Sequence, residues 1–129
     1  WYWLHVKPNT QGVATLYCSY PAASGNWVST PLVEGVDSLQ VQLGLVPPAT
    51  SVLQWRTPET MHNDASSDDL WRFVRAVRIA LIFDGGHNQS LAQSTLNPFG
   101  DGQTISLPND GHWRSGLSHT FALQGVHPL

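Results

Sequence analysis

The chain has 129 residues, with nine Asp and Glu against six Lys and Arg, which gives a formal net charge of −3 at pH 7. This length suits one globular domain over residues 1–129, large enough to bury a core without a metal or disulfide staple. A single cysteine excludes an intramolecular disulfide, and the acidic balance argues against a nucleic-acid-binding face, which needs clustered basic residues. Charged residues make up 12%, against roughly 25% in an average globular protein.

The start of the chain predicts a β-hairpin. Residues 1–6 are aromatic and β-prone, residues 7–12 carry turn-forming Pro, Asn and Gly, and residues 13–20 are expected to form the returning strand. Cys18 lies in this second strand on the same face as Leu16 and Tyr20, where a small core residue is the simplest interpretation. The chain therefore begins with a strand that needs cover on at least one face.

A change of period marks the next segment. Residues 27–29 are expected to form a short strand, and residues 32–36 a helical turn or an irregular lead-in. Apolar and polar residues then alternate, which predicts a strand over residues 37–45 that is buried on one face. Pro47 and the proline after it end this strand, because proline cannot donate to a ladder.

A similar turn-then-strand unit follows a long polar segment, residues 49–68. One helical turn is expected at residues 58–62, and residues 66–69 offer oxygens for a helix N-cap. The apolar residues of the turn that follows, including Trp71, are expected to lie in the core.

The last part of the chain predicts three strands separated by turns. Residues 77–83 alternate on a largely apolar background, which indicates a strand that is covered on both sides or is central in its sheet. Residues 84–86 are expected to form a turn and residues 87–102 a loop. A short strand is predicted at residues 103–107 and a closing strand at residues 119–126.

These elements add up to an α+β protein that is mainly β, with about six strands in antiparallel sheets, short helical turns and long loops. A sheet of this kind needs an apolar layer against its inner face. A second small sheet, a helix outside this sequence, or both could supply that layer.

No motif for catalysis or cofactor binding occurs. The sequence has no Gly-x-Ser-x-Gly turn, no phosphate-binding or dinucleotide-binding glycine pattern, and only Glu34 and Glu59 as glutamates for glycosidase chemistry. Six histidines lack ligand spacing, so no metal-ligating residue is predicted. The oxygen-rich loops leave calcium open, with turn formation as the simpler interpretation, at Asp84, Asn88, Asp101, Asn109 and Asp110.

Four tryptophans are the candidate partner contacts. Trp55 and Trp113 lie in polar surroundings, and exposed tryptophan is a frequent interface anchor. Trp1 and Trp3 are expected to face whatever covers the first strand. Three arginines between residues 72 and 78 are interpreted as solvated edge charges that discourage strand-to-strand aggregation.

The order and spacing of four segments resemble the C-terminal globular part of PilW-type minor pilins of the type IV pilus. The segments are residues 16–18 (LYC), 31–41 (PLVEGVDSLQV), 71–81 (WRFVRAVRIAL) and 120–123 (TFAL). The resemblance spans most of the chain and implies a pilin-like globular domain. It implies no enzyme activity, no cofactor and no small-molecule substrate.

The resemblance also implies a partner set and a location. Such proteins carry a long apolar N-terminal helix, absent from this chain, that anchors the subunit in the inner membrane and then packs in the fibre. Its second half would cover the inner face of the sheet. Other minor pilins and the major pilin are the implied partners, with a surface receptor or DNA at the pilus tip. The implied location is the inner membrane and periplasm of a Gram-negative bacterium, then the extracellular pilus.

Two alternatives stay open from the sequence. A J-type pseudopilin of a type II secretion system is a relative with similar patterning. An adhesive or carbohydrate-binding β-domain would show the same low charge and tryptophan-rich loops.

Overall fold

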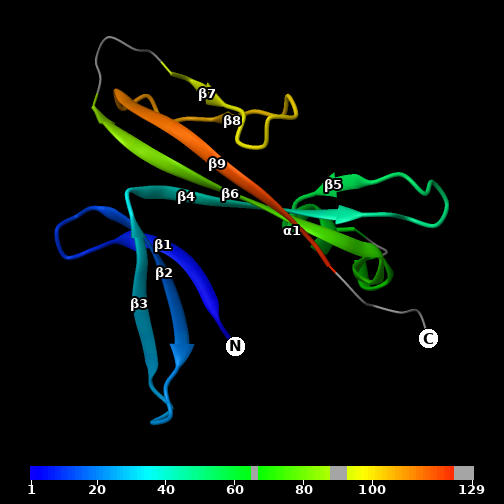
Figure 1. Cartoon of the computed structure of the whole chain (residues 1–129), viewed down its shortest axis with the longest axis horizontal. Helices are drawn as coiled ribbons and strands as arrows, with labels where there is room; N and C mark the ends of the chain where they lie inside the picture. The colour runs from blue at the N-terminus through cyan, green and yellow to red at the C-terminus, as the bar shows by residue number, and fades with distance from the viewer. Residues whose placement is uncertain (65–66, 88–92, 124–129) are drawn as a thin grey trace. The chain divides into compact units, whose positions relative to one another are not determined.

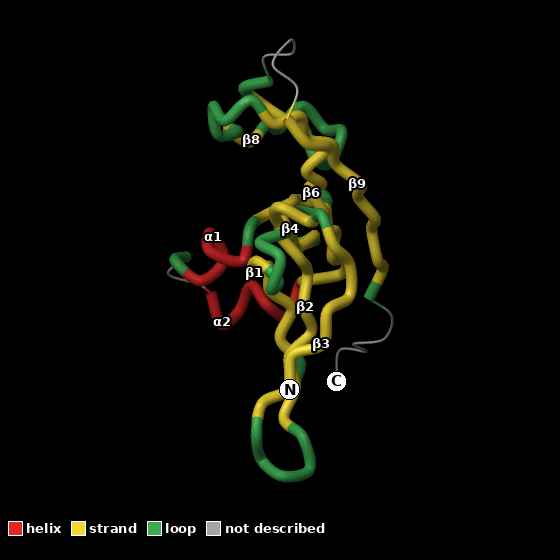
Figure 2. Tube along the Cα trace, turned by 90° about the vertical axis from the view of Figure 1, so that its left-hand side faces the viewer, coloured by secondary structure: helices red, strands yellow, loops and turns green. Residues whose placement is uncertain are grey.

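A computed structural model describes residues 1–64, 67–87 and 93–123 of the chain. The prediction of a mainly β, antiparallel protein with short helical turns is confirmed (Figure 2). The helical segments are α1 (Pro58–His62), α2 (Ser67–Leu70) and the 3₁₀ helix η1 (Trp71–Phe73). The strands are β1 (Trp3–Pro8), β2 (Ala14–Pro21), β3 (Trp27–Glu34), β4 (Val36–Leu45), β5 (Gln54–Arg56), β6 (Val74–His87), β7 (Thr95–Leu96), β8 (Ile105–Ser106) and β9 (His112–Ala122).

The strands form three sheets (Figure 1). One has the order β1-β2-β3, the second β5-β4-β6-β9, and β7 pairs with β8 in the third. The predicted hairpin is confirmed by the antiparallel register of β1 and β2, in which Leu4 lies opposite Cys18 and Val6 opposite Leu16. The Asn9 side chain holds its turn, accepting from the backbone N–H groups of Gln11 and Val13 at 2.9 Å each.

The chain divides into two compact units. One comprises Trp1–Leu39 and Leu81–Leu117, and the other Gln40–Ala80 and Ser118–Leu129. The first holds the β1–β3 sheet and the β7–β8 pair, and the second holds β5, α1, α2 and η1. A single domain over residues 1–129 stays a prediction.

The expected helical turn at residues 32–36 is wrong. β3 runs to Glu34, and β4 begins at Val36 after a reversal at Gly35, whose φ of +78° suits a residue without a Cβ. The register of β2 with β3 shifts between Leu16 and Tyr17, which lie opposite Val33 and Pro31, so β3 carries one extra residue there and its alternation is interrupted. This β-bulge in β3 obscures the period of two that would have predicted a longer strand.

The expected turn at residues 84–86 is also wrong, because β6 continues to His87. The Asp84 carboxylate accepts from the N–H of Gly86 at 2.8 Å, and Gly86 has a φ of +89°. These turn-forming residues therefore distort the strand locally without ending it.

Other boundaries differ as well. β9 begins at His112, seven residues before the predicted start, and the predicted end of that strand lies outside the described residues. β8 is shorter than predicted, and β5 and β7 lie where polar loops were expected. Ser66, one of the expected N-cap residues, also lies outside the described residues.

Trp71 does not lie in the core as expected, because 46% of its surface is exposed. The helical segment there is short, with α2 followed at once by the 3₁₀ turn. The residues on either side of this 3₁₀ turn, Leu70 and Val74, pack against the core instead.

The core of the second unit is built around Leu43, Leu45 and Met61. Leu43 and Leu45 are alternate residues of β4, as the sequence pattern predicts, and Met61 projects from α1. Thr57 caps this helix by accepting from the N–H of Thr60 at 3.1 Å, ahead of a proline at the helix start. α1 is thereby fixed as the cover of the buried end of β4.

Met61 is the residue on which this small core depends. Met61→Ala should lower the free energy of unfolding by about 2–4 kcal/mol, because the side chain is fully buried and its removal leaves a cavity. Val52→Ala, at an exposed position of the same unit, should change it by less than about 0.5 kcal/mol. Urea unfolding measures both, and equal losses would contradict the placement of Met61.

Candidate functional site

A buried arginine organises the polar part of the first unit. Arg114 on β9 has 4% of its surface exposed. Its Nε donates to Asp37 at 2.7 Å, and its two terminal nitrogens donate to Asp110 at 2.9 and 2.6 Å. The Gln93 side chain pairs with both backbone polar groups of Arg114, at 2.7 and 2.8 Å. A charge taken out of water is thus matched by two carboxylates, which is the condition for burying it at tolerable cost.

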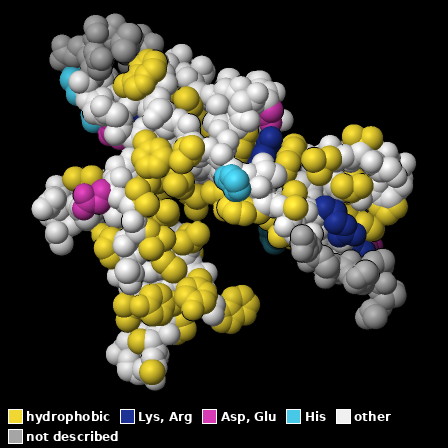
Figure 3. Space-filling model, viewed as in Figure 1, with side chains coloured by type: hydrophobic (Ala, Val, Ile, Leu, Met, Phe, Trp, Pro, Cys, Tyr) yellow, Lys and Arg dark blue, Asp and Glu magenta, His cyan; other side chains and the backbone are white. Residues whose placement is uncertain are grey.

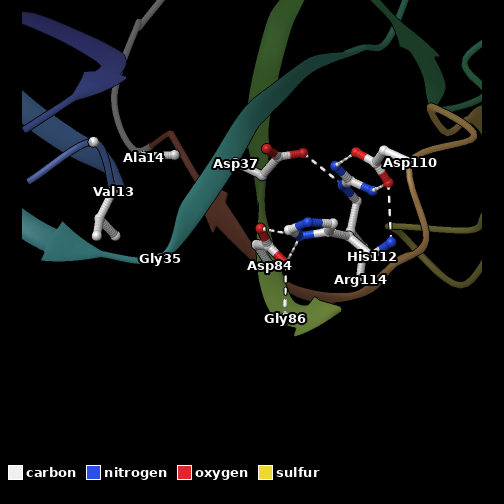
Figure 4. A pocket seen from close by; sticks show the side chains of 10 residues that line it. Val13, Ala14, Gly35, Asp37, Asp84, Gly86, Asp110, His112 and Arg114 are labelled. Carbon is white, nitrogen blue, oxygen red and sulfur yellow. Dashed lines mark hydrogen bonds and ion pairs between the residues drawn. The ribbon is translucent and has the colours of Figure 1, made fainter. Parts of the chain in front are cut away.

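A second pair lies beside it. The Asp84 carboxylate on β6 accepts from Nδ1 of His112 at 2.8 Å, and the Asp84 N–H donates to the Gly35 carbonyl at 2.9 Å. We call Arg114, Asp37, Asp110, Asp84 and His112 the Arg114 cluster. Figure 4 shows these side chains converging on one another, with dashed lines for the contacts.

The Arg114 cluster lines a cavity of about 450 Å³ together with the turn residues of β1–β2 and β3–β4. Its acidic and basic groups already satisfy one another, and no Ser, Thr or Cys is among the described residues that line it. No group of three or more His, Cys, Asp or Glu residues in the described ranges is arranged to hold a metal ion. The arrangement fits an ion-pair cluster that fixes β4, β6 and β9 to one another within this unit.

The cluster perturbs its own carboxylates. The hydrogen bonds from Arg114 hold the pKa of Asp110 well below its ordinary value, and Asp110 in turn raises the pKa of Arg114. Burial acts to raise the pKa of Asp84, but hydrogen bonds from His112 and the Gly86 N–H outweigh it and leave this pKa lowered. Both carboxylates are therefore stabilised in their charged form.

Sequence reasoning missed this cluster. Asp84 and Asp110 were expected to be turn formers or calcium ligands. Each accepts from the backbone N–H two residues further on, as a turn former does, and each also pairs with a basic side chain, Asp84 with His112 and Asp110 with Arg114. The available signal was the spacing Asp110-x-His112-x-Arg114, which puts three polar side chains on one side of an extended chain.

The β1–β3 sheet has two unlike faces. Successive residues of a strand point to opposite sides. The registers place apolar residues of the three strands opposite one another, and aromatic and hydroxyl residues opposite one another. In Figure 3 hydrophobic side chains gather over this sheet. One side, which we call the apolar face, carries Leu4, Val6, Leu16, Cys18, Tyr20, Val28, Thr30 and Val33.

The apolar face is incompletely covered. Leu16 is buried, but Leu4, Val28 and Val33 are exposed, and Cys18 is half-buried. Exposed apolar residues that form a continuous patch typically mark an interaction site. This face is the strongest candidate for contact with another polypeptide.

The opposite side, the aromatic–serine face, carries Trp3, His5, Lys7, Tyr17, Ser19, Trp27 and Ser29. It therefore places Trp3 away from the apolar face. A groove of about 330 Å³ lies on it, lined by all of these residues except Tyr17.

The other predicted contact residues have different surroundings. Trp1 is fully exposed, and Trp113 on β9 is 40% exposed and packs beside Gly85. Trp55 is half-buried, with the guanidinium of Arg78 4.3 Å from the centre of its ring. Their role as partner contacts stays a prediction.

Arg78 itself is not the solvated edge charge that was expected. It is 7% exposed, and its Nε donates to the Gln42 side chain at 2.8 Å. Gln42 and Trp55 come from β4 and β5, on strands that the sequence did not pair with β6, so local patterning could not find this site. Arg72 and Arg75 are exposed as expected.

No helix in the described ranges is both long and apolar enough to cross a lipid bilayer. Comparison with known families matches residues 2–125 to the sequence model of type IV pilus-assembly protein W, PilW. Neither a curated protein nor a solved structure matches the chain significantly. The family match covers nearly the whole chain and includes both units.

The Arg114 cluster makes stability depend on acid pH. Asp84 and Asp110 have lowered pKa values in the folded state, so their contribution is complete above the unfolded value of about 3.9 and is lost as the pH falls through the folded values. The free energy of unfolding should therefore fall between about pH 5 and pH 2.

Asp110→Asn should make this acid dependence shallower, because one of the two titrating carboxylates is gone. Denaturant unfolding measured across that pH range tests this. Glu34→Gln is the control. Glu34 is exposed, and its carboxylate accepts from the Asn9 side chain, which lies outside the Arg114 cluster. An unchanged slope in Asp110→Asn would contradict the role of the cluster.

Proposed function

The chain belongs to the family of type IV pilus-assembly protein W, and we propose that it is the globular part of a minor pilin. The single observation that carries this proposal is the family match over residues 2–125. It extends the segment-by-segment resemblance of the sequence to almost every described element. Because the family is a pilus-assembly family, its members have partners in the pilus and a place in the cell envelope.

We propose that the apolar face of the β1–β3 sheet is the seat of a long apolar α-helix carried before Trp1 in the complete protein. Half-exposed Leu and Val side chains on one sheet face support this. Fully burying such a side chain stabilises by about 1.5–3 kcal/mol, so covering several of them provides a driving force of several kcal/mol. A helix with an apolar stripe is one of the layers that can cover the apolar face of a sheet.

The subunit so built would help prime pilus assembly and lie at or near the pilus tip. Its partners would be other minor pilins and the major pilin, with the helix anchoring it in the inner membrane before assembly. Adhesion, twitching motility or DNA uptake would be the processes it serves. The family description names the type IV pilus, which favours this role over that of a J-type pseudopilin.

We propose no catalytic role for this chain. PilW is a structural, non-enzymatic family. The Arg114 cluster supports this proposal, because its charged side chains pair with one another.

Adjacent positions on β3 test the seat of the helix. Thr30 lies on the apolar face opposite Cys18, and Ser29 lies on the other face opposite Ser19. Both are small, polar and exposed, so either can become Glu without displacing a core side chain, and Ser29→Glu also removes the hydrogen bond between Ser29 and Ser19. Thr30→Glu should abolish surface pili in a complemented cell, because it places a charge under the helix.

Ser29→Glu is the matched control and should leave piliation intact. Pilus number is counted by electron microscopy, and the melting temperature of each purified variant shows that it folds. Normal piliation with Thr30→Glu, or equal loss with both variants, would contradict the proposed seat.

A further inference from the structure

The aromatic–serine face of the β1–β3 sheet, opposite the proposed helix seat, carries a groove. Trp3 and Trp27 line it and are 62% and 59% exposed. Two large indoles that stay exposed to water lose the stabilisation that burial of their apolar surface would give. We propose that this groove binds an oligosaccharide.

The floor of the groove is a chain of hydroxyl and imidazole groups. Ser19 is 4% exposed, and its Oγ lies 2.8 Å from Nε2 of His5 and 2.7 Å from Oγ of Ser29. Each hydroxyl can donate once and accept twice, so Ser29 retains hydrogen-bonding capacity toward the open side. A hydrogen-bonded row fixed in this way is a preformed set of contacts for ligand hydroxyl groups.

Three aromatic side chains of the face, Trp3, His5 and Tyr17, contact one another in a row. The ring centres of Trp3 and His5 lie 4.7 Å apart, and His5 stacks on Tyr17 at 5.8 Å with planes 16° apart. The ammonium of Lys7 lies 4.6 Å from the centre of the Tyr17 ring. Because these side chains order one another, a ligand loses less conformational entropy on binding than it would against free side chains.

The two indoles are spaced for more than one sugar ring. Trp3 on β1 lies opposite Ser19 on β2, which lies opposite Ser29 on β3. Trp27 is two residues before Ser29 on β3. With strands about 4.8 Å apart and a rise of about 3.3 Å per residue, their Cα atoms are separated by roughly 12 Å. The groove between them therefore suits an oligosaccharide.

The chemistry of the face matches a saccharide. A sugar ring has a face of C–H bonds with partial positive charge, which suits the negative face of an indole. Its hydroxyl groups suit the serine row, and Lys7 can donate to a hydroxyl or a carboxylate. A single-stranded nucleic acid would also stack on the indoles, but Lys7 is the one Lys or Arg among the described residues that line the groove. Phosphate backbones require more positive charge than this.

The inference does not depend on the pilus assignment. The proposed helix seat uses the apolar face, while this groove lies on the opposite face of the same sheet. If no glycan binds, the assembly proposal is unaffected. If Thr30→Glu binds glycan normally but does not support piliation, the glycan proposal is unaffected by the loss of assembly.

Glycan binding by the 129-residue chain tests the proposal. The probes are neutral oligosaccharides (β-1,4-linked glucose and N-acetylglucosamine oligomers), acidic ones (oligogalacturonate and sialyllactose), and a dT oligonucleotide. Titration followed by intrinsic tryptophan fluorescence and calorimetry should show saturable binding of at least one saccharide. The neutral and acidic arms show whether Lys7 meets a hydroxyl or a carboxylate.

Variants place the binding on this face. Trp27→Ala and Trp3→Ala should each weaken binding about tenfold or more, since loss of a stacked anchor typically costs over 1.4 kcal/mol. Trp27→Tyr should retain most of the affinity. Val28→Ala on the apolar face and Trp113→Ala on β9 are the matched controls, and both should bind as the parent chain does.

The parent residues are more than half exposed at positions 3 and 27, so the variants should keep the parent melting temperature. Absence of saturable binding to every saccharide at millimolar concentration would overturn the proposal. So would binding that survives both tryptophan substitutions, or saturable binding of the oligonucleotide alone.

Discussion

The central constraint on this molecule is that the β1–β3 sheet is a single layer with two different faces. β2 lies between β1 and β3, and the antiparallel registers align apolar residues on one side and aromatic and hydroxyl residues on the other. A sheet can bury a face only against another layer. Within the described residues of this unit, Leu16 is buried while Leu4 and Val28 stay exposed, so the apolar side is incompletely covered there, which is the basis of the proposed helix seat.

The rest of the same unit contains the Arg114 cluster, whose ion pairs link three strands. Arg114 ties the start of β4, through Asp37, to the turn before β9, through Asp110. The Asp84–His112 pair adds a contact between β6 and β9. Because each buried charge has a partner, the cluster supports the strands without offering reactive groups, in keeping with a family whose work is assembly.

Much of the fold could be predicted from the sequence because it is local. The turn residues before Val13 and the β-prone segments on either side predict the hairpin, and the alternation from Leu39 to Leu45 predicts the buried end of β4. The errors arose where a tertiary contact overrides a local signal. Asp84 and the glycines after it read as a turn, but pairing with His112 and a positive φ at Gly86 let the strand continue.

The candidate sites were harder to predict, for a related reason. Trp3 was expected to face whatever covers the first strand, and its position beside Ser19 and Ser29 on the other face depends on two strand registers, one of which contains a bulge. Arg78 looked like a surface charge because its partners, Gln42 and Trp55, lie on strands remote in the sequence. Side chains that meet across a sheet leave no periodic signature along either strand.

The most direct test of the helix seat uses the single cysteine of the chain, Cys18, in the middle of the apolar face. Labelling of its thiol by a small maleimide can be timed in the isolated 129-residue chain and in the complete protein within assembled pili. The account predicts that Cys18 is labelled in the isolated chain and strongly protected in the pilus. A thiol moved to the other face (Cys18→Ala with Ser29→Cys) should be labelled in both. Equal labelling of Cys18 in the two states would contradict the account.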